Sequence, residues 1–513
     1  MTSHLQRQVE KIIDTGQGQS RDVIIRMGGP EVDTRGFMPL ASEAIRRRLL
    51  VSSARDLLPV DADLLARSAS KKVSANTRRK LASRSSSLTA QTALSVATVI
   101  GRVALRAAGL EALAPLLDSD FMGKVLAEAS EKRRKGPVTQ KLWSARSVAM
   151  TRIKLEDLAK LPSEVPGIQD IYPNRRLSLP NYARVQSLPQ TIRDNKASAW
   201  GVHAIGALAT WGAYGARGEG MKIAVLDTGV DAEHPDLVGK INDWAEFDAD
   251  GNEVAGSTAH DTDEHGTHVA GTLVGGKVSG QWIGVAPAAK LAVAMVLDGE
   301  KGGTDAQVLA GIDWALERGV HVINMSLGGL TLFPDVPNTY TTAIIEALQL
   351  GVPVVAAIGN EGGQTTGSPG NDLFAYAVGA TDHEDRAAGF SGGRTQIIRE
   401  SNVLPPESLP LPYLKPDVSA PGVAIHSAIP NGKWAAFSGT SMATPHAAGA
   451  IALLLSATSI ADIDGPQRAF LIQDLLTGSV EELGETGQDQ RFGFGRIDVL
   501  RAIGAAIERG FVV

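Results

Sequence analysis

One stretch of the chain reads Phe437-Ser438-Gly439-Thr440-Ser441-Met442-Ala443-Thr444-Pro445-His446, and an apolar run over residues 447–455 follows it directly. An apolar run after a glycine-containing turn predicts a buried helix. We expect Pro445 in the first turn of that helix, where a missing N–H costs little. Ser441 is then exposed at the helix N-terminus, where backbone N–H groups and the helix dipole favour a developing negative charge. This position suits a nucleophile.

The part of the chain that begins at Met221 alternates apolar runs with helical stretches. The runs occupy residues 222–226, 290–296, 320–325, 352–358 and 375–380. The clearest helix is predicted over residues 305–318, with a cap at Thr304 and a terminator at Gly319. Strands that are apolar on both faces and alternate with helices indicate a doubly wound parallel sheet. We therefore predict an α/β fold.

Three polar residues follow the ends of these predicted strands: Asp227, Ser326 and Asn360. In an open parallel sheet, functional groups collect beyond the carboxyl ends of the strands. These three residues are therefore candidates for a functional site.

The first third of the chain has a different pattern. A strand is predicted over residues 22–26, and a strand, a short helix and a second strand are predicted over 147–173. They indicate a small α+β unit with a helical insertion over about residues 40–140. Residues 175–200 are polar without a clear period, as in a linker. The expected parts are a basic N-terminal domain (1–185), a linker with a possible self-processing site (186–200) and an α/β domain (201–513).

The composition is that of an ordinary globular protein, with 43% hydrophobic and 21% charged residues among 513. Cysteine is absent, which excludes disulfides, thiolate metal sites and cysteine catalysis. The first residues lack the apolar core of a secretory signal, and charged residues interrupt the apolar-rich stretch 90–117. We expect no membrane span and a cytoplasmic location, with secretion by an unrecognised route as the alternative.

Charge is distributed unevenly along the chain. Residues 1–185 contain 31 Lys and Arg against 18 Asp and Glu, a balance of +13, and the remainder has a balance of −19. The two parts are either two independently solvated surfaces or two surfaces that attract each other. Binding of nucleic acid by the basic part is disfavoured, because no interleaved arginine and aromatic residues accompany the charge.

Two further blocks complement Ser441. Asp227-Thr228-Gly229 follows a predicted strand, and His265-Gly266-Thr267-His268 opens a predicted helix. A serine hydroxyl is a poor nucleophile unless a base takes its proton, and an imidazole base needs a carboxylate to fix its tautomer. Asp227, His265 and Ser441 together provide this set for acyl transfer.

Each block alone allows another interpretation. An Asp-Thr-Gly triplet also marks aspartic proteases, where two carboxylates share a proton, but the α/β part contains only one. His265 and His268 could form a metal-binding pair with Asp261 and Asp263 nearby, although no third ligand is obvious. The three blocks in this order are far more specific than any one of them.

The ordered set resembles the subtilases, the subtilisin-like serine proteases. The resemblance covers about residues 195–505 and includes the stretches 415–422 and 492–498. It implies a subtilisin-like doubly wound sheet and a serine endopeptidase.

The resemblance also implies a role for each site residue. Asp227 would orient the base, His265 would be the general base and then the general acid, and Ser441 would be the nucleophile. The Asn360 side chain and the Ser441 backbone N–H would form the oxyanion hole, because a tetrahedral oxyanion requires preorganised donors.

A substrate-binding segment is implied at Ser326, Leu327, Gly328 and Gly329, where few side chains prevent a peptide from pairing with the backbone. Gly367 matches the floor of the pocket for the residue that precedes the cut. A glycine floor leaves room for a large apolar or unbranched side chain.

Two departures from the family pattern stand out. In many subtilases a loop after the histidine helix binds calcium, but here residues 275–282 offer Lys277 and Val278 where oxygen ligands are needed. Asp236 remains as a plausible carboxylate ligand; we predict no cofactor, with calcium as a possibility that the loop does not match. The second departure is a longer segment over residues 389–412, expected to be a surface loop.

The N-terminal third faintly resembles a subtilase pro-region, as in a zymogen. We expect residues 1–185 to act as an intramolecular inhibitor that self-cleavage between about residues 180 and 200 releases. The expected partners are protein or peptide substrates, with no nucleic acid and no membrane. The alternatives are an inactive protease-like module and a peptidase kept silent by its N-terminal domain until a partner binds.

Overall fold

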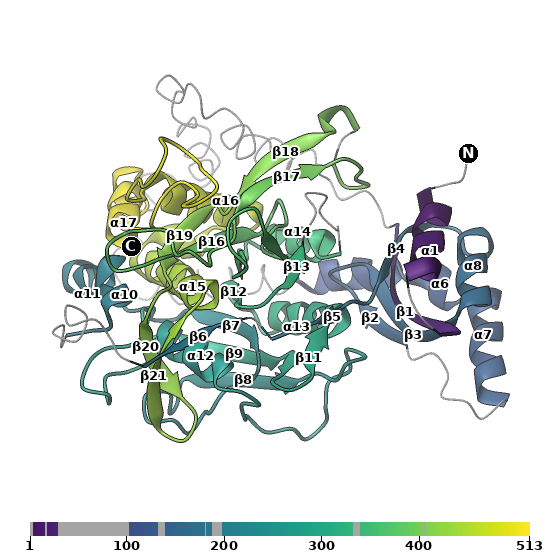
Figure 1. Ribbon diagram of the computed structural model, residues 1–513, viewed down its shortest axis with the longest axis horizontal. Coiled ribbons are helices and arrows are strands. Elements are labelled where there is room, and N and C mark those ends of the chain that lie inside the picture. The colour runs from purple at the N-terminus through teal and green to yellow at the C-terminus, as the bar shows by residue number, and fades with distance from the viewer. Residues whose placement is uncertain are drawn as a thin grey trace, which may run out of the picture.

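The computed structural model describes residues 4–15, 18–28, 102–131, 139–179, 181–186, 197–331, 339–404 and 406–512. They form a smaller N-terminal domain and a larger α/β domain (Figure 1). Most of the expected helical insertion and residues 187–196 of the expected linker lie outside the described residues. Within the described ranges, no helix combines the length and the apolar character that a bilayer crossing requires.

A seven-stranded sheet forms the centre of the α/β domain, and every neighbouring pair of its strands is parallel. The order across the sheet is β19-β16-β14-β12-β7-β9-β8. Its strands are β7 (Lys222–Asp227), β8 (Ile241–Glu246), β9 (Lys290–Met295), β12 (Val322–Met325), β14 (Val354–Ala357), β16 (Tyr376–Thr381) and β19 (Val418–Pro421). The predicted doubly wound α/β fold is confirmed, and β8 and β19 add two strands that were not predicted.

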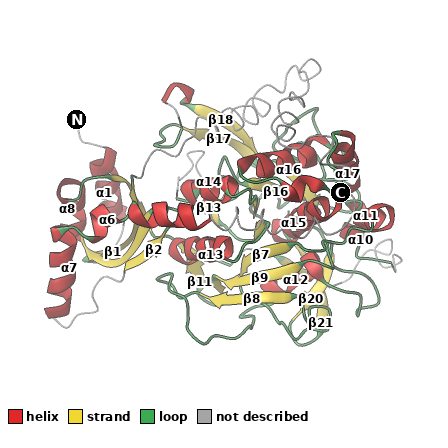
Figure 2. Cartoon of the chain, turned by 180° about the vertical axis from the view of Figure 1, so that it is seen from behind, coloured by secondary structure: helices red, strands yellow, loops and turns green. Residues whose placement is uncertain are grey.

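Helices cover both faces of this sheet (Figures 1 and 2). In β7, Ile223 and Val225 belong to one apolar core, whereas Ala224 and Leu226 belong to the other. Because successive strand residues point to opposite faces, β7 is buried on both sides. The helices are α10 (Trp200–Ala204), α11 (Ala207–Tyr214), α12 (His265–Val274), α13 (Asp305–Glu317), α14 (Thr341–Gln349), α15 (Thr440–Ala457), α16 (Pro466–Gly478) and α17 (Val499–Glu508).

Helix α15 begins earlier than the sequence predicts. Its first residue is Thr440, so Pro445 lies inside the helix and not in its first turn. Pro445 has no N–H to donate to the carbonyl four residues before it, which is that of Ser441. That carbonyl oxygen instead accepts a hydrogen bond from Ser326 Oγ at 2.9 Å. The proline therefore allows the start of α15 to be tied to the end of β12.

The N-terminal domain is built on a four-stranded antiparallel sheet in the order β2-β3-β1-β4, with helices on one face. Its elements are α1 (His4–Thr15), β1 (Ser20–Met27), α6 (Ala114–Leu117), α7 (Asp120–Glu131), β2 (Thr139–Leu142), β3 (Ser147–Lys154), α8 (Leu155–Glu164) and β4 (Ile168–Pro173). Val23 and Ile25 pack in the domain's own core, whereas Ile24 and Tyr172 join the core that contains α13 and α14. The open face of this sheet therefore docks on the α/β domain.

Polar contacts reinforce this docking. The Asp313 carboxylate on α13 accepts hydrogen bonds from the backbone N–H groups of Trp143 and Ser144, at 2.7 and 3.0 Å, and from the Ser144 hydroxyl. Arg146 forms a buried ion pair of 2.6 Å with Glu346 on α14. Both acidic partners belong to the α/β domain, as the uneven charge distribution suggests.

The shorter strands outside the two main sheets line the regions where functional residues are expected. They are β5 (Arg176–Leu177), β6 (Ala183–Val185), β10 (Leu297–Asp298), β11 (Gly302–Thr304), β13 (Gly329–Thr331), β15 (Thr366–Ser368), β17 (Arg394–Ile398), β18 (Leu411–Lys415), β20 (Ile425–Ile429) and β21 (Lys433–Ser438). The α/β domain also contains two short 3₁₀ helices, η1 (Pro406–Ser408) and η2 (Ser459–Asp462).

Residues 174–179 and 181–186, here called the strap, run from the N-terminal domain across the α/β domain. β5 pairs antiparallel with β11, and β6 pairs antiparallel with β21. The expectation of a linker from residue 175 onward is therefore wrong for this first part. The partners of the strap are more than one hundred residues away in the chain, so no local periodicity announces the pairing.

The segment 389–412, expected as a surface loop, contributes instead to the hairpin β17–β18 (Figure 1). Its base is anchored by Tyr413, whose hydroxyl donates to the Asn371 carbonyl at 2.6 Å. Beyond β17, Asn402 Nδ2 donates to the Asp170 carboxylate on β4 at 3.2 Å. Glu400 lies 3.0 Å from Nδ1 of His4 on α1. The hairpin thus holds the N-terminal domain from a second side.

Candidate active site

Asp227 and His265 meet at the carboxyl end of strand β7, next to the central strand β12. Asp227 is the last residue of β7, and His265 is the first residue of α12. His265 Nδ1 lies 2.7 Å from Asp227 Oδ1, and both side chains are fully buried. Burial alone would lower the pKa of His265, but the adjacent Asp227 carboxylate outweighs burial, and the pKa is raised. The predicted base and its orienting carboxylate are thus brought together.

Ser441 is the second residue of α15, as a nucleophile at a helix N-terminus should be. Its Oγ donates a hydrogen bond to the Ser326 carbonyl at 3.1 Å. Nε2 of His265 is buried and has no hydrogen-bond partner within the described part of the chain. Ser441 itself is fully buried, so the expectation of an exposed serine is wrong for this state. The site is closed, and the Ser441 hydroxyl is bonded to Ser326 and not to His265.

Asn360 follows β14 at the same edge of the sheet. Its Oδ1 accepts hydrogen bonds from the backbone N–H and the hydroxyl of Thr440, both at 2.8 Å. Since these donors occupy the oxygen, the amide nitrogen is turned away from them. Asn360 Nδ2 donates to the main-chain carbonyl oxygen of Asn181 in the strap, at 2.5 Å. The predicted oxyanion donor therefore already holds a peptide carbonyl.

The predicted substrate-binding residues line the same region. Ser326 and Leu327 are buried, and Gly329 begins β13, which pairs antiparallel with β15. Gly367 lies on β15 opposite Leu330. A side chain at position 329 would come within 3.1 Å of Leu177 in the strap. The strap thus lies against this segment; a role in binding other peptides stays a prediction.

The first part of the strap is fixed to α13. Asn174 Oδ1 accepts a hydrogen bond from the backbone N–H of Ala306 at 3.0 Å, in the first turn of the helix. Arg175 pairs through Nε, at 2.8 Å, with the fully buried Asp305 carboxylate. Arg175 also donates to the Ser368 hydroxyl at 3.3 Å. These contacts and the β5–β11 pairing hold the chain that leads into the site.

The second part of the strap covers the base. The Tyr182 ring lies with its centroid 5.2 Å from that of His265 and 4.7 Å from that of Phe437. Its hydroxyl donates to Asp263 Oδ1 at 2.6 Å. Arg184 pairs with Glu264 at 3.2 Å. No sequence motif marks Tyr182 or Arg184; their one signal is their place in the range of about 180–200 expected for self-processing.

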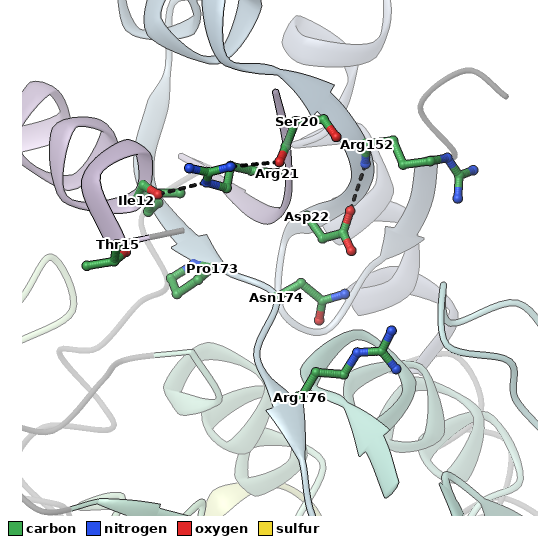
Figure 3. Close-up of a pocket in the computed structure, with 9 residues that line it drawn as sticks. All are labelled: Ile12, Thr15, Ser20, Arg21, Asp22, Arg152, Pro173, Asn174 and Arg176. Atoms are coloured by element: carbon green, nitrogen blue, oxygen red, sulfur yellow. Dashed lines mark hydrogen bonds between the residues drawn. The ribbon is translucent and has the colours of Figure 1, made fainter. Parts of the chain in front are cut away.

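A pocket of about 670 Å³ lies where the strap leaves the N-terminal domain. Figure 3 shows its lining, to which the strap contributes Asn174 and Arg176. The Arg21 guanidinium in its wall is engaged by backbone carbonyls, with 2.7 Å to that of Ile13. The pocket contains none of the predicted site residues, so it does not belong to the candidate active site.

The geometry does not favour a metal site at the two histidines. Nδ1 of His265 is bound to Asp227, and Nε2 of His268 lies 2.9 Å from the Ile425 carbonyl oxygen. Burial lowers the pKa of His268 to about 3, as for a structural core histidine. The described residues contain no group of three or more His, Cys, Asp or Glu side chains that could hold a metal ion.

Asp236, the plausible calcium ligand, is engaged by donors from two sides. Its Oδ1 accepts the backbone N–H of Val278 at 2.7 Å, and its Oδ2 accepts Nε1 of Trp434 at 2.8 Å. The carboxylate thus links the loop after α12 to β21. This is a structural use that needs no cation.

The comparisons with known proteins agree with the geometry. Residues 218–495, more than half of the chain, match the model of the subtilase family. Subtilisin E of Bacillus subtilis (strain 168) is 37% identical over 277 residues, which are 53% of this chain and 62% of that protein. The chain thus covers less than two thirds of the length of subtilisin E.

Two further relatives are covered more fully. The intracellular serine protease of Paenibacillus polymyxa is 39% identical over 259 residues, 50% of this chain and 72% of that protein. The subtilisin of Bacillus pumilus is 37% identical over 277 residues, 53% of this chain and 86% of that protein. The matched region contains the parallel sheet, Asp227, His265, Asn360 and Ser441, and the chain belongs to the subtilase family.

Proposed function

We propose that this protein is a serine endopeptidase that hydrolyses peptide bonds through a seryl acyl-enzyme. The observation that carries the proposal is the hydrogen bond of 2.5 Å from Asn360 Nδ2 to the Asn181 carbonyl oxygen. A peptide carbonyl lies where an oxyanion would be stabilised, beside a buried Asp–His pair and a serine at a helix N-terminus.

The chemistry follows from these positions. Ser441 Oγ turns from the Ser326 carbonyl toward His265, gives its proton to Nε2 and attacks the peptide carbonyl carbon. Asp227 stabilises the imidazolium, and Asn360 donates to the developing oxyanion. The imidazolium then protonates the leaving amine. In the second half, His265 takes a proton from water, the water attacks the acyl-enzyme carbonyl, and His265 returns the proton to Ser441 Oγ as the ester bond breaks.

The N-terminal domain with its strap acts as an intramolecular inhibitor. With the strap in place Asp227, His265 and Ser441 are fully buried, so no external peptide can reach them in this state. The docking contacts of Asp313 and Glu346 and the charge balance of the two parts support this role.

Release requires a cut in the strap. Because the carbonyl of Asn181 lies on Asn360, the bond presented to Ser441 is Asn181–Tyr182. This bond lies within the range of about 180–200 expected for self-processing, and four residues before the segment 186–200 expected to be the linker. Asn181, the residue before this bond, is short and polar. The preference for a large apolar or unbranched side chain over Gly367 therefore stays a prediction.

A second candidate is a peptidase kept silent until a partner binds. The observation that favours it is the Ser441 hydroxyl bonded to Ser326 and not to His265. In that case the strap would stay intact until a partner displaced the N-terminal domain.

A fluorophosphonate probe tests the proposal, since such probes label only an activated serine. Wild-type protein that has been incubated until its chain is cut should carry the adduct on Ser441, and the Ser441→Ala variant should carry none. A cut wild-type chain without an adduct would contradict the endopeptidase.

The remaining expectations stay predictions. We propose that the loop over residues 275–282 functions without calcium, because Asp236 is engaged by Val278 and Trp434. A chelator should then leave the melting temperature unchanged. The cytoplasmic location and the lack of nucleic-acid and membrane partners also stay predictions.

A further inference from the structure

The strap continues beyond the peptide bond that is presented to Ser441. With the Asn181 carbonyl on Asn360, the residues after that bond are Tyr182, Ala183 and Arg184. They lie on the side that a leaving peptide would occupy. Residues on this side were not assigned to any binding role from the sequence.

A backbone edge receives this part of the strap. β6 pairs antiparallel with β21, with Ala183 opposite Ser438 and Arg184 opposite Phe437. The strap therefore adds a third strand to the hairpin β20–β21. Strand addition of this kind binds peptides through main-chain hydrogen bonds, and side-chain pockets then give specificity.

A slot receives the first side chain after the bond. Its walls are the rings of His265 and Phe437, and Phe437 is itself buried and stacked on His268 at 4.3 Å between centroids. At its end the Asp263 carboxylate accepts the Tyr182 hydroxyl. Burial and Asp263 raise the pKa of the Tyr182 phenol, which keeps it a donor. The slot fits a flat ring with a donor at its tip.

A carboxylate faces the third side chain after the bond. Arg184 lies 3.2 Å from Glu264, which directly precedes His265. Both side chains are more than one third exposed, at 56% and 38%, so the pair discriminates only modestly.

We propose that the β21 edge, the slot between His265 and Phe437, and the carboxylates of Asp263 and Glu264 form a leaving-side groove for substrates. This groove favours tyrosine directly after the cut bond and lysine or arginine two residues further on. The inference rests on the proposed endopeptidase and adds the class of peptide that the site prefers.

Quenched peptides test the groove on the cut wild-type enzyme. All peptides carry the strap's own residues before the cut bond. After the bond they have Tyr, Phe or Ala at the first position and Arg, Ala or Glu at the third. We expect kcat/KM to be roughly 10-fold higher for Tyr than for Phe, because the phenol bonds a charged acceptor. Arg should exceed Glu by about 2- to 5-fold at low salt, and the ratio should shrink as salt rises.

Charge variants separate the two subsites. Glu264→Gln should abolish the preference for Arg, and Glu264→Lys should reverse it, while both keep the Tyr-to-Phe ratio. Glu233→Gln, at an exposed acidic residue outside the groove, is the matched control and should keep both ratios.

Mass spectrometry of the products fixes the cut position in every peptide. Equal rates for Arg and Glu in the wild type would overturn the charge subsite, and equal rates for Tyr and Ala would overturn the slot. If the strap is cleaved but no peptide is cut, the proposed groove is wrong. If neither the strap nor any peptide is cut, the proposed endopeptidase activity is wrong.

Discussion

The side-chain amide of Asn360 donates a hydrogen bond of 2.5 Å to the main-chain carbonyl oxygen of Asn181. Asn360 follows β14 in the α/β domain, whereas Asn181 belongs to the strap. Because the Thr440 donors fix Oδ1 of Asn360, the amide points at this carbonyl in one orientation. The closed state therefore resembles an enzyme with its substrate in place.

Removal of the Asn360 amide should slow the reaction without opening the site. In Asn360→Ala the developing oxyanion loses one preorganised donor, and we expect self-cleavage to slow by about 100- to 1,000-fold, the loss typical of such a donor in subtilisin-like enzymes. A time course of chain cutting on denaturing gels measures this. Gln364→Ala, an exposed change on the same loop, is the control. Equal rates for Asn360→Ala and the control would contradict the oxyanion role.

The Asp227–His265 pair sets the acid limb of the pH profile. Because Asp227 raises the pKa of His265, the imidazole stays protonated, and inactive as a base, up to a higher pH than an ordinary histidine. Activity should be present above the raised pKa and lost as pH falls through it. In Asp227→Asn the rate should drop by about 10,000-fold and the acid limb should move to lower pH. Self-cleavage rates across the acid and neutral range measure both; an unmoved limb would exclude His265 as the titrating base.

Asp313 should make stability depend on pH. Burial raises the pKa of Asp313 from 3.8 to about 7, although three donors from the N-terminal domain oppose the shift. A raised native pKa gives a stabilising contribution that is complete below 3.8 and is lost as pH rises through about 7. The melting temperature of the Ser441→Ala chain should therefore fall over this window.

Asp313→Asn in that background removes the titrating group, so the fall should become shallower. Glu253→Gln, at an exposed acidic residue, serves as the control and should keep the slope of the parent chain. The same slope in all three chains would show that Asp313 does not carry this dependence.

The hairpin β17–β18 should prolong the inhibited state after the strap is cut. In the wild type, Asp170 accepts hydrogen bonds from Asn402 and, at 2.9 Å, from Nε of Arg26. Asn402→Asp replaces the first donor with a second carboxylate, which repels Asp170. We expect the delay between chain cutting and the onset of peptide hydrolysis to shorten several-fold, with an unchanged rate of cutting. Pro412→Ala on β18, at an exposed position, is the control. A delay equal to that of the wild type would show that the hairpin contact does not retain the domain.

Much of the α/β domain could be predicted because its signals are local. Apolar runs such as residues 222–226 form β7, and the cap at Thr304 is formed with the Gln307 N–H at 3.2 Å. Asp227 and His265 are recognisable from their blocks, and the fold brings them within 2.7 Å. Short motifs carry this information because each one combines an element boundary with a reactive side chain.

The rest depends on partners that are distant in sequence. The strap has no periodicity of its own, since its strands exist only against β11 and β21. The Tyr182 ring that covers His265 comes from the strap. The Ser441 carbonyl, which Pro445 cannot reach with an N–H, is bonded instead by Ser326 Oγ at the start of α15. Contacts between segments that are distant in the chain have no signature in the local sequence, so they could not be predicted from it.

The new N-terminus of the cut chain shows which peptide bond is presented to Ser441. Wild-type and Ser441→Ala chains are incubated side by side, and the products are identified by intact-mass and peptide mass spectrometry. We expect a wild-type fragment that begins at Tyr182 and forms at a rate independent of protein concentration, and we expect the Ser441→Ala chain to stay intact. A first cut at any other bond, or the same cut in Ser441→Ala, would show that Ser441 does not cleave the Asn181–Tyr182 bond.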